Sequence, residues 1–551
     1  SEAPLESSCL SNGEVFADEI RLEDALIVEA DSSCQAQGCG SIMSFLAVAC
    51  VAFALRVAAA AEQCPIAECK ERAPSLTPTG QSVRVYGPGL RGNFRLPARY
   101  FFVQVVDADG SNFTTSAPGN LSVNILGTQS HCSIWTQVLS RGDGLFFVRY
   151  KIFRTCPEAK IEIAYKGSPL AESPILLRGP LHHDTCNCPI PYNEWLGHLE
   201  CRAVDPQILA DLTDFEKVDM KKVLQDALQR FDRPGSVSFC HYAVVKNQVY
   251  RKCYGQHVGF NMFMDQILLS LARKVVLPDV EMLVNLGDWP LERKDYWGKP
   301  VPFFSWCGSN STRDIVMPTY DLTESSLEMM GRVTLDMLSV QGHGGPAWKD
   351  KEPSGFWRGR DSRQERLDLV ALSRRYPDLL NASLTNFFFF RDKMEEYGPQ
   401  ASHISFFDFF RHKYQINVDG TVAAYRLPYL LAGSGLVLKQ DSEYYEHFYP
   451  RLVAMEHYVP FRRDLSDLVQ KLDWARKNDE RVQRIVRSAQ QFVLDYLLPH
   501  HVLCYYAQLL QEYSLRLIRK VDIHQTMEHV PQPRDESSCA CTQAQASHDE
   551  L

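Results

Sequence analysis

An aspartate follows directly after one of the expected strands of the 551-residue chain. The segment Val284–Pro290 reads as an apolar strand that ends in a glycine turn, and this turn presents Asp288. Open α/β sheets bind ligands beyond the carboxyl ends of their strands, so Asp288 is placed to serve as a general base. The same spacing is typical of an aspartate that only caps a loop, and the segment by itself leaves both interpretations open.

Arginines gather in a second segment, Trp357–Arg366, where a strand is expected to end and a helix to begin. Arginine forks suit phosphate oxygens, and a helix N-terminus adds amide donors and a favourable dipole. The alternative is a solvated basic face paired with Asp361 and Glu365. The four arginines that could meet a phosphate-bearing donor are Arg358, Arg360, Arg363 and Arg366.

A third segment, Asn417–Arg426, reads as a strand, a glycine turn and a helix that opens with small residues. Small side chains let a diphosphate approach the amides of a helix closely. The sequence has no G-x-S-x-G, H-E-x-x-H or Walker pattern, which disfavours hydrolases, metalloproteases and ATPases. We therefore expect a phosphate-bearing donor in a two-lobed cleft.

Residues 83–180 are expected to form a small antiparallel β-sandwich. Short strands at 100–106, 121–126, 145–153 and 160–165 are separated by turn residues. The tripeptide Arg141-Gly142-Asp143 falls where a hairpin turn is needed, and Asp107-Ala108-Asp109 falls at a strand end, so we interpret both as turns. The segment Tyr86–Leu90 resembles the opening of a filamin-type immunoglobulin-like repeat.

Helices and short strands alternate from residue 186 to residue 520, which indicates an open parallel sheet covered on both faces, in two halves. Long helices at 466–498 and 500–519 close this part. The other expected helices are 208–231, 263–275, 361–376, 404–414 and 421–431, and the expected strands are 281–286, 356–358, 415–418 and 435–438.

Charge and composition narrow the class of protein. The apolar content of 45% and charged content of 23% are ordinary for a folded chain. The net charge is −9, of which residues 1–61 carry −7, so the remainder is nearly neutral. Nucleic-acid binders carry a basic excess, and no nucleic-acid partner is therefore expected.

Both ends of the chain indicate the lumen of the endoplasmic reticulum. Residues 43–61 read as a secretory signal peptide rather than a membrane span, because the apolar run 45–55 is too short to cross a bilayer. Residues 1–42 form an acidic, low-complexity extension, and our hypothesis is that Met43 is the true start. A linker at 62–82 follows, and the polar tail 521–551 ends in the retention tetrapeptide His548, Asp549, Glu550 and Leu551. Glycosylation sequons lie at Asn112, Asn120, Asn310 and Asn381.

An oxidising lumen favours disulfides among the 17 cysteines. The C-x-C pairs at 186–188 and 539–541 lack companion pairs at zinc-site spacing, so we predict disulfides rather than metal corners. Thirteen cysteines follow the signal peptide, and this odd number leaves at least one free or paired between chains.

Residues 186–520 resemble glycosyltransferase family 90, the protein O-glucosyltransferases. With the filamin-type domain in front and the KDEL-type ending, the chain is similar to the KDEL motif-containing branch of that family. The motifs that carry the resemblance are Asn285–Pro290, Trp357–Arg360 with Glu365–Arg366, Asp419–Arg426 and His457–Pro460.

The resemblance implies a multidomain fold, with an α/β GT-B glycosyltransferase of two Rossmann-like lobes after the sandwich. It also implies inverting transfer of glucose from UDP-glucose to serine hydroxyls of EGF-like repeats, as in Notch and fibrillin. Asp288 aligns with the catalytic base. Arg366 aligns with the nucleotide-sugar site, together with the run Thr421, Val422, Ala423, Ala424, Tyr425 and Arg426.

Two further expectations follow from the resemblance. An electrostatic clamp of Arg366, Arg426 and the helix amides near Thr421 would meet the charge of the departing diphosphate, so no metal or other cofactor is expected. A disulfide between Cys186 and Cys504 is also implied.

Relatives that act on the better-known serine carry Arg-Gly-Ser-Arg where this chain has Arg358-Gly359-Arg360-Asp361, and this departure bears on donor or acceptor preference. Two alternatives remain from sequence. One is an O-xylosyltransferase that uses UDP-xylose, and the other is a catalytically silent lumenal binding or quality-control protein on the same fold. Besides the acceptor, the expected partner is the KDEL receptor. No membrane-spanning segment is expected.

Overall fold

The computed structural model describes residues 75–76, 82–107, 109–113, 119–327, 335–533, 539 and 541. The extension at 1–42, the signal peptide at 43–61, most of the 62–82 linker and the retention tetrapeptide lie outside these residues. They stay predictions. Within the described part of the chain, no helix is long and apolar enough to cross a membrane.

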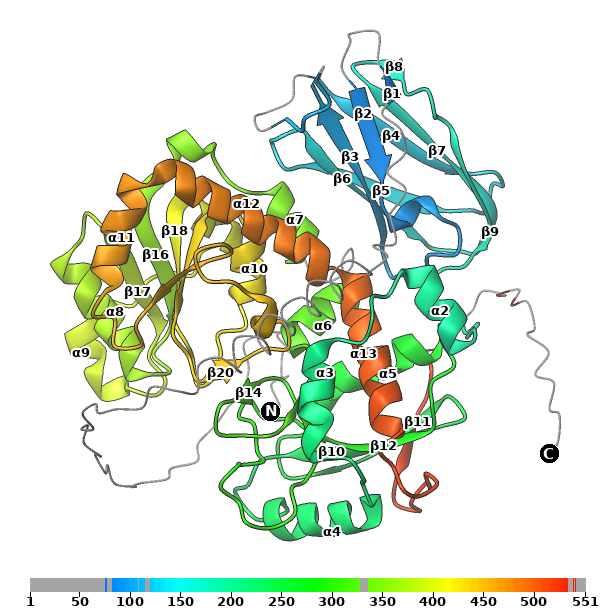
Figure 1. Ribbon diagram of the computed structural model, residues 1–551, viewed down its shortest axis with the longest axis vertical. Coiled ribbons are helices and arrows are strands. Elements are labelled where there is room, and N and C mark those ends of the chain that lie inside the picture. Colours follow the sequence, from blue (N-terminus) through cyan, green and yellow to red (C-terminus); the bar gives the residue numbers. More distant parts are fainter. Residues whose placement is uncertain are drawn as a thin grey trace, which may run out of the picture. The chain divides into compact units, whose positions relative to one another are not determined.

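The expected β-sandwich is present, with two antiparallel sheets around one apolar core (Figure 1). One sheet has the order β1-β2-β3-β6-β5, and in the other β7 pairs with β4, β8 and β9. The disulfide Cys132–Cys156 lies within this part of the chain. The strands are β1 (Ser75–Leu76), β2 (Ser82–Tyr86), β3 (Arg99–Val106), β4 (Leu121–Gly127), β5 (Ile134–Ser140), β6 (Leu145–Ile152), β7 (Cys156–Tyr165), β8 (Ser168–Pro169) and β9 (Ile175–Leu181).

Both short motifs in the sandwich are turns, as predicted. The Arg-Gly-Asp tripeptide connects β5 to β6, and Gly142 and Gly144 adopt φ values of +90° and +85°, which favour glycine. The Arg141 guanidinium is held by Asp143 at 2.8 Å. At the end of β3, Asp107 accepts hydrogen bonds from the amides of Asp109 and Ser111.

The first sheet of the α/β body has six strands in the order β15-β13-β12-β10-β11-β22. The prediction of a parallel sheet is wrong here for half of the strands, since β10, β11 and β22 pair antiparallel. For the β10–β11 pair the reason is local: Lys246 and Asn247 both have positive φ and form a two-residue hairpin, which can join only antiparallel strands. The strands are β10 (Phe239–Val245), β11 (Gln248–Tyr254), β12 (Val280–Asn285), β13 (Phe303–Ser305), β15 (Ile315–Val316) and β22 (Glu528–Val530).

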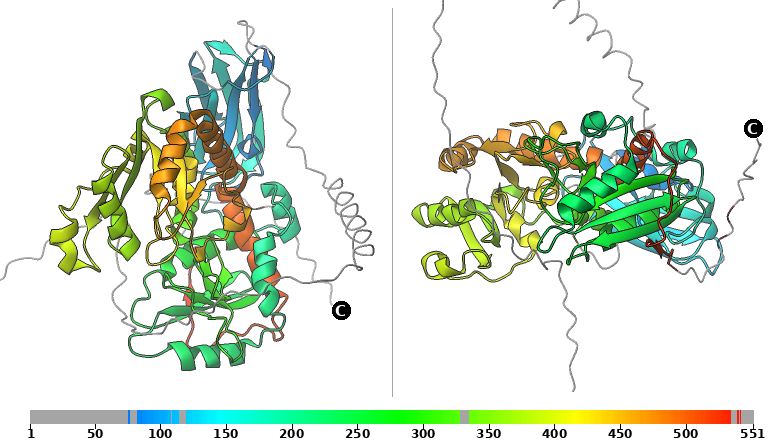
Figure 2. Two further views of the ribbon diagram at one scale, coloured as in Figure 1. Left: turned by 60° about the vertical axis from the view of Figure 1, so that its left-hand side comes forward. Right: turned by 90° about the horizontal axis from the view of Figure 1, so that it is seen from below.

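The second sheet is parallel throughout, as predicted, in the order β17-β16-β18-β19-β21. Helices α11 (Leu468–Lys477) and α12 (Asp479–Tyr496) lie together beside its strands and share its apolar core (Figure 2). A short ladder of β14 and β20 joins a loop of the first sheet to a loop of the second. These strands are β14 (Gly308–Ser309), β16 (Glu352–Arg360), β17 (Leu380–Asn386), β18 (His412–Asn417), β19 (Leu436–Gln440), β20 (Tyr444–Tyr445) and β21 (Val459–Phe461).

Four predicted helices differ from the observed ones, and one of them, expected at 466–498, is divided at Asn478 into two helices. The helix expected at 208–231 is broken, because Phe215 and Val218 turn inward and are buried between its two halves. Residues 406–411 form a 3-10 helix that leads straight into β18. The helix expected at 421–431 begins only at Leu427, because Pro428 is tolerated in a first turn but its ring would clash with a preceding helical turn.

The α-helices of the body are α2 (Tyr192–Leu199), α3 (Pro206–Asp211), α4 (Met220–Phe231), α5 (Asn261–Ala272), α6 (Tyr320–Leu327), α7 (Met337–Gly342), α8 (Gln364–Arg375), α9 (Met394–Tyr397), α10 (Leu427–Ala432), α11 (Leu468–Lys477), α12 (Asp479–Tyr496) and α13 (Pro499–Ser514). Helix α13 is buried on most of its surface and packs against α6 and β12. The last long helix of the chain therefore belongs to the core of the first sheet.

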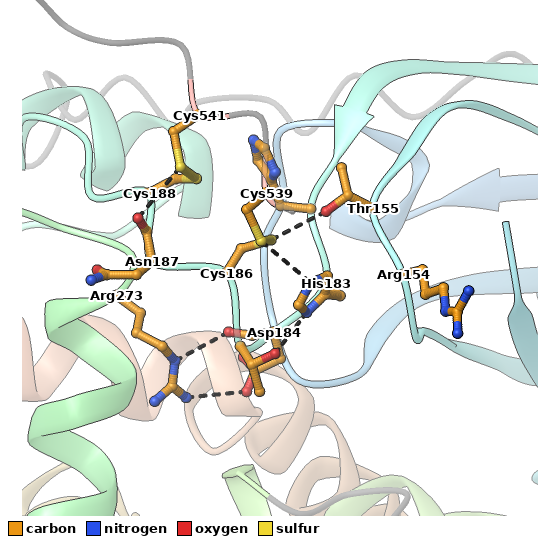
Figure 3. Close-up of a disulfide and its surroundings, with 12 residues drawn as sticks. Arg154, Thr155, His183, Asp184, Cys186, Asn187, Cys188, Arg273, Cys539 and Cys541 are labelled. Atoms are coloured by element: carbon orange, nitrogen blue, oxygen red, sulfur yellow. Dashed lines mark hydrogen bonds and ion pairs between the residues drawn. A yellow bond between two sulfur atoms is a disulfide. The ribbon is translucent and has the colours of Figure 1, made fainter. Parts of the chain in front are cut away.

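The C-x-C cysteines form disulfides, as predicted, and they join the start of the body to its end. Cys186 pairs with Cys539 and Cys188 with Cys541 (Figure 3). The pairing of Cys186 with Cys504 is wrong, since Cys504 lies in α13 and bonds to Cys201 just after α2. Cys240–Cys253 crosses the β10–β11 hairpin. The free cysteine among the described residues is the buried Cys307.

A buried ion pair ties the sandwich to the α/β body. Arg149 on β6 contacts Asp336 at 2.7 Å and donates to Ser339 at 2.9 Å. Asp336 also caps α7 by accepting the amides of Leu338 and Ser339. Since both charged side chains are almost fully buried, this contact fixes β6 against α7.

Candidate active site

Asp288 lies in the loop after β12, and the buried Asn285 shapes this loop. The side chain of Asn285 accepts the amide of Gly287 at 2.9 Å and donates to the carbonyl of Trp289 at 2.7 Å. One amide group therefore holds the backbone on both sides of Asp288. A strand that ends in Asn-Leu-Gly-Asp folds in this way because an asparagine side chain mimics a backbone turn.

A second layer of polar contacts supports the same loop. Asn285 donates to the Ser305 hydroxyl at 3.0 Å, and Ser305 donates to Asp314 at 2.7 Å. Asp314 also accepts the amides of Leu291 and Glu292. Burial raises the pKa of Asp314 to about 6, against the hydrogen bonds that it accepts. This row connects β12, β13 and the start of β15 beneath the Asp288 loop.

Three side chains from separate elements surround the half-buried carboxylate of Asp288. The Tyr320 hydroxyl at the start of α6 lies 3.5 Å from Oδ1. Burial raises the pKa of Asp288, while the charge of Arg360 and hydrogen bonds from Tyr320 and Thr421 act in the opposite direction. The structure thus brings together Asp288 from the first sheet with Arg360 and Thr421 from the second, as the sequence predicted.

An aromatic cluster fixes the Tyr320 ring. It stacks on Phe263 with ring centroids 5.2 Å apart, and it meets the edges of Trp306 and Tyr425 at 5.6 and 5.4 Å. Edge-to-face and stacked contacts of this kind hold a ring in one orientation. Tyr425 belongs to the 421–426 segment, so this cluster also holds that segment next to Asp288.

Arg366 is the most constrained of the predicted arginines. Its guanidinium is buried and donates to the carbonyls of Asp419 at 2.7 Å, Arg360 at 3.0 Å and Val418 at 3.4 Å. Burial and the nearby Arg426 lower the pKa of Arg366 to about 9. Arg366 therefore joins the ends of β16 and β18, and it carries positive charge directly beneath the Gly420 turn.

The side chains of Arg358 and Arg360 have different surroundings, although the two residues lie only two positions apart on β16. Arg358 donates to the Asn381 side chain on β17 at 2.8 Å, away from Asp288. The register of β16 against β17 shifts between Gly359 and Arg360, which turns the last residue of the strand. Asp361 is buried. It accepts hydrogen bonds from the backbone amides of Phe388 and Phe390, which both follow β17.

The 421–426 segment is a series of turns rather than the opening of a helix. Val422, Ala423 and Ala424 are buried, and Gly420 donates to the Val422 carbonyl at 2.8 Å. The amides of Val422, Ala423 and Ala424 have no acceptor within the described part of the chain. Arg426 donates to the carbonyl of Arg358 and thereby ties the segment to β16. Backbone amide donors are therefore present near Asp288, as expected, but a loop supplies them instead of the predicted helix N-terminus.

Sequence reasoning missed Tyr320 and Cys307. Tyr320 follows β15, which has only two residues and shows no period in sequence. The Cys307 thiol donates to the carbonyl of Asp288 at 3.4 Å, and burial raises the pKa of this thiol well above its ordinary value. Nothing in the sequence around a single cysteine indicates that it will lie next to Asp288.

The other predicted residues are placed as follows. The sequon asparagines Asn112, Asn120, Asn310 and Asn381 are all exposed, and their glycosylation stays a prediction. Among the described residues, neither of the two clusters of three metal-ligating side chains includes Asp288. The expectation that the reaction needs no metal is likewise still a prediction.

The fold and site define a multidomain α/β protein, in which an immunoglobulin-like sandwich precedes an α/β body that holds the half-buried carboxylate of Asp288. The chain belongs to glycosyl transferase family 90, which matches residues 197–550. Residues 78–176 match the filamin/ABP280 repeat. The family and the filamin-type repeat named from sequence are therefore confirmed.

Relatives span most of the chain. Protein O-glucosyltransferase 2 of Danio rerio is 52% identical over 471 residues, which cover 85% of this chain and 94% of the relative. Protein O-glucosyltransferase 3 of Homo sapiens is 45% identical over 489 residues, which cover 87% of this chain and 96% of the relative. Among solved structures, the Lin-41 filamin domain has 18% sequence identity and a TM-score of 0.15, covering 19% of this chain and 95% of that chain.

Proposed function

We propose that this chain is an inverting, GT-B-type protein O-glucosyltransferase of the endoplasmic reticulum lumen. The donor is UDP-glucose, and the acceptor is a serine hydroxyl of an EGF-like repeat of the kind found in Notch and fibrillin. The names of its relatives support protein O-glucosylation. The observation that carries the proposal is the carboxylate of Asp288 between Tyr320, Arg360 and Thr421.

Asp288 is the general base of this proposed reaction. As the serine oxygen attacks the anomeric carbon, the bond to the UDP oxygen breaks on the opposite face of the sugar, and the serine proton passes to Asp288. The raised pKa of Asp288 suits this role, because a base is most effective when its pKa lies near the working pH. General-base assistance of this kind contributes roughly 10²- to 10⁴-fold in rate.

The leaving diphosphate is stabilised by the second sheet. The charge of Arg360 acts on Asp288, so we assign Arg360 to the phosphate next to the reacting sugar carbon. Arg366 and Arg426 hold the backbone of the Gly420 turn and add positive charge beneath it. The amides of 422–424 complete the donor set, and fixed donors of this kind stabilise charge that develops in a transition state.

A transfer assay tests the proposal. The purified protein is incubated with UDP-glucose and a folded EGF-like repeat, beside Asp288→Asn and the control Asp295→Asn, an exposed aspartate further along the same loop that pairs with Arg293. We expect one hexose on the acceptor by mass spectrometry with the parent and with Asp295→Asn, and at least a 100-fold loss with Asp288→Asn.

Two results would replace the proposal. A pentose added from UDP-xylose in preference to glucose would make the chain an O-xylosyltransferase. No transfer from any UDP-sugar, with UDP still bound, would make it a lumenal binding protein. The compartment has its own test, since removal of His548–Leu551 is expected to release the protein into the medium through loss of binding to the KDEL receptor.

A further inference from the structure

A second group of chemically active side chains lies on the first sheet, outside the candidate active site. His241 on β10 and Glu281 on β12 are on neighbouring antiparallel strands, where Ala243 is paired with Glu281. His241 and Ala243 are two residues apart, so their side chains and that of Glu281 share one face of the sheet. His241 Nε2 lies 2.7 Å from Glu281 Oε1, and both side chains are buried.

The third member comes from the C-terminal segment between α13 and β22. His524 Nε2 lies 3.6 Å from the same oxygen of Glu281, and its ring centroid lies 5.3 Å from that of His241. The side chain of His524 is 45% exposed. Two imidazoles and one carboxylate therefore lie close together, and the cluster is open to solvent on the side of His524.

The geometry of this cluster fits a divalent metal. The three ligand atoms, one from each residue, all lie within 4.8 Å of one another. A tetrahedral Zn²⁺ holds its nitrogen and oxygen ligands at about 2.0–2.1 Å, which places the ligand atoms about 3.3 Å apart. The contacts of 2.7 and 3.6 Å need only small adjustments to reach that spacing.

The burial of Glu281 also favours a cation. Among the described residues, the ion-pair partners of Glu281 are the two imidazoles. A carboxylate buried away from water is stable only when it is paired or coordinates a metal. A metal bound by all three side chains would provide positive charge and leave the fourth position to water.

We propose that His241, Glu281 and His524 bind one Zn²⁺, which clips the C-terminal segment to the first sheet. The donor set of imidazole and carboxylate suits Zn²⁺ among the divalent metals. The clip lies between α13 and β22 in the chain, ahead of the disulfides at Cys539 and Cys541. The second cluster of this kind, His183 with Cys186 and Cys539, is excluded because its sulfur atoms are bonded to each other (Figure 3).

Zinc titration of the full chain tests this site. The tag-free protein, with its disulfides intact, is stripped with a chelator and titrated with ZnCl₂ in a calorimeter, and Co²⁺ is used as a spectroscopic probe. The test variant is His524→Gln. The matched control is His529→Gln on β22, an exposed histidine of the same segment whose Nε2 lies 3.1 Å from Gln248 Oε1.

We expect one Zn²⁺ per chain in the parent and in His529→Gln, with a tetrahedral Co²⁺ spectrum. His524→Gln is expected to weaken binding by about 100-fold or more, since loss of even an outer-shell partner costs 10- to 100-fold. Zn²⁺ is also expected to raise the Tm of the parent and not that of His524→Gln, because a ligand of the folded state stabilises it.

The proposal is overturned if the parent binds no stoichiometric Zn²⁺, or if His524→Gln binds it as tightly as His529→Gln. Glu281→Gln gives a second test in case His524→Gln is poorly folded. It keeps the shape of the side chain and removes the charged ligand, so unchanged Zn²⁺ affinity in a folded Glu281→Gln protein would also refute the site.

Discussion

Removing the hydroxyl of Tyr320 tests how Asp288 is tuned. Tyr320→Phe keeps the ring that packs on Phe263, Trp306 and Tyr425, so the aromatic cluster should persist. It removes one donor, which lies 3.5 Å from Asp288 Oδ1. That hydrogen bond favours the ionised carboxylate and lowers the pKa of Asp288 against burial, so its loss raises the pKa of Asp288 further.

The sign and size of the effect follow from this geometry. The proposed base must be ionised, so kcat/KM falls as the pH falls through the pKa of Asp288, and the variant should begin to fall at higher pH. A hydrogen bond to a charged group contributes about 1.5–3 kcal/mol in good geometry. At 3.5 Å the bond is long, and we expect about 1 kcal/mol, which is about a fivefold lower kcat/KM on the acid limb.

The assay is glucose transfer to an EGF-like repeat across a series of pH values, with kcat/KM plotted for the parent and Tyr320→Phe. Above both pKa values the carboxylate is ionised in each protein, and the plateaus should agree within about threefold. Tyr376→Phe, at an exposed tyrosine just after α8, is the control and should leave the profile unchanged. An acid limb that stays in place, or moves to lower pH, would refute the assignment of Asp288 as the titrating base.

Three further predictions concern stability. Arg149→Ala should lower the unfolding free energy by about 3 kcal/mol in urea, because it leaves Asp336 buried without its ion pair, whereas the exposed Arg178→Ala should change it little. Because burial raises the pKa of Asp314 to about 6, its ionisation is resisted in the folded state, so the stability of the parent relative to Asp314→Asn should fall by about 2 kcal/mol as the pH rises from 4 to 6; a flat difference would argue against this shift. Replacing Cys201 and Cys504 together by serine should cost about 4 kcal/mol, since their disulfide closes a loop with a sequence separation of 303, and unchanged urea midpoints would contradict this.

The strand patterns in the sequence predicted much of the fold. The elements that were predicted wrongly have local causes. The alternation in the sandwich and the apolar strands of the second sheet were sufficient to predict both. In the first sheet, strand β12 was predicted, but the antiparallel strands and β15 were not, because Lys246-Asn247 is an uncommon hairpin turn and β15 has only two residues. The prediction of a helix from residue 421 did not take Pro428 into account. A proline disfavours a helical turn before it, and this constraint was visible in the sequence.

The site was predictable where it depends on the ends of strands. Asp288 follows β12, and Arg360 ends β16, so the rule for open sheets located both. The divergence of Arg358 from Arg360 depends on a register shift, which no spacing in the sequence reveals. Tyr320 reaches Asp288 only through packing between distant segments, and such contacts need the tertiary structure.

The placement of the C-terminal segment sets an order of events during synthesis. Strand β22 completes the edge of the first sheet beside β11, and Cys504, Cys539 and Cys541 bond to cysteines that precede that sheet in the chain. At about 5–20 residues per second, the ribosome delivers these partners tens of seconds after the first strands emerge. By the end of that interval every strand of the second sheet has been made, whereas the edge of β11 is still open and the early cysteines still lack their partners. The half that carries Asp288 is therefore the last to finish folding and is the half most exposed to incorrect disulfide pairing.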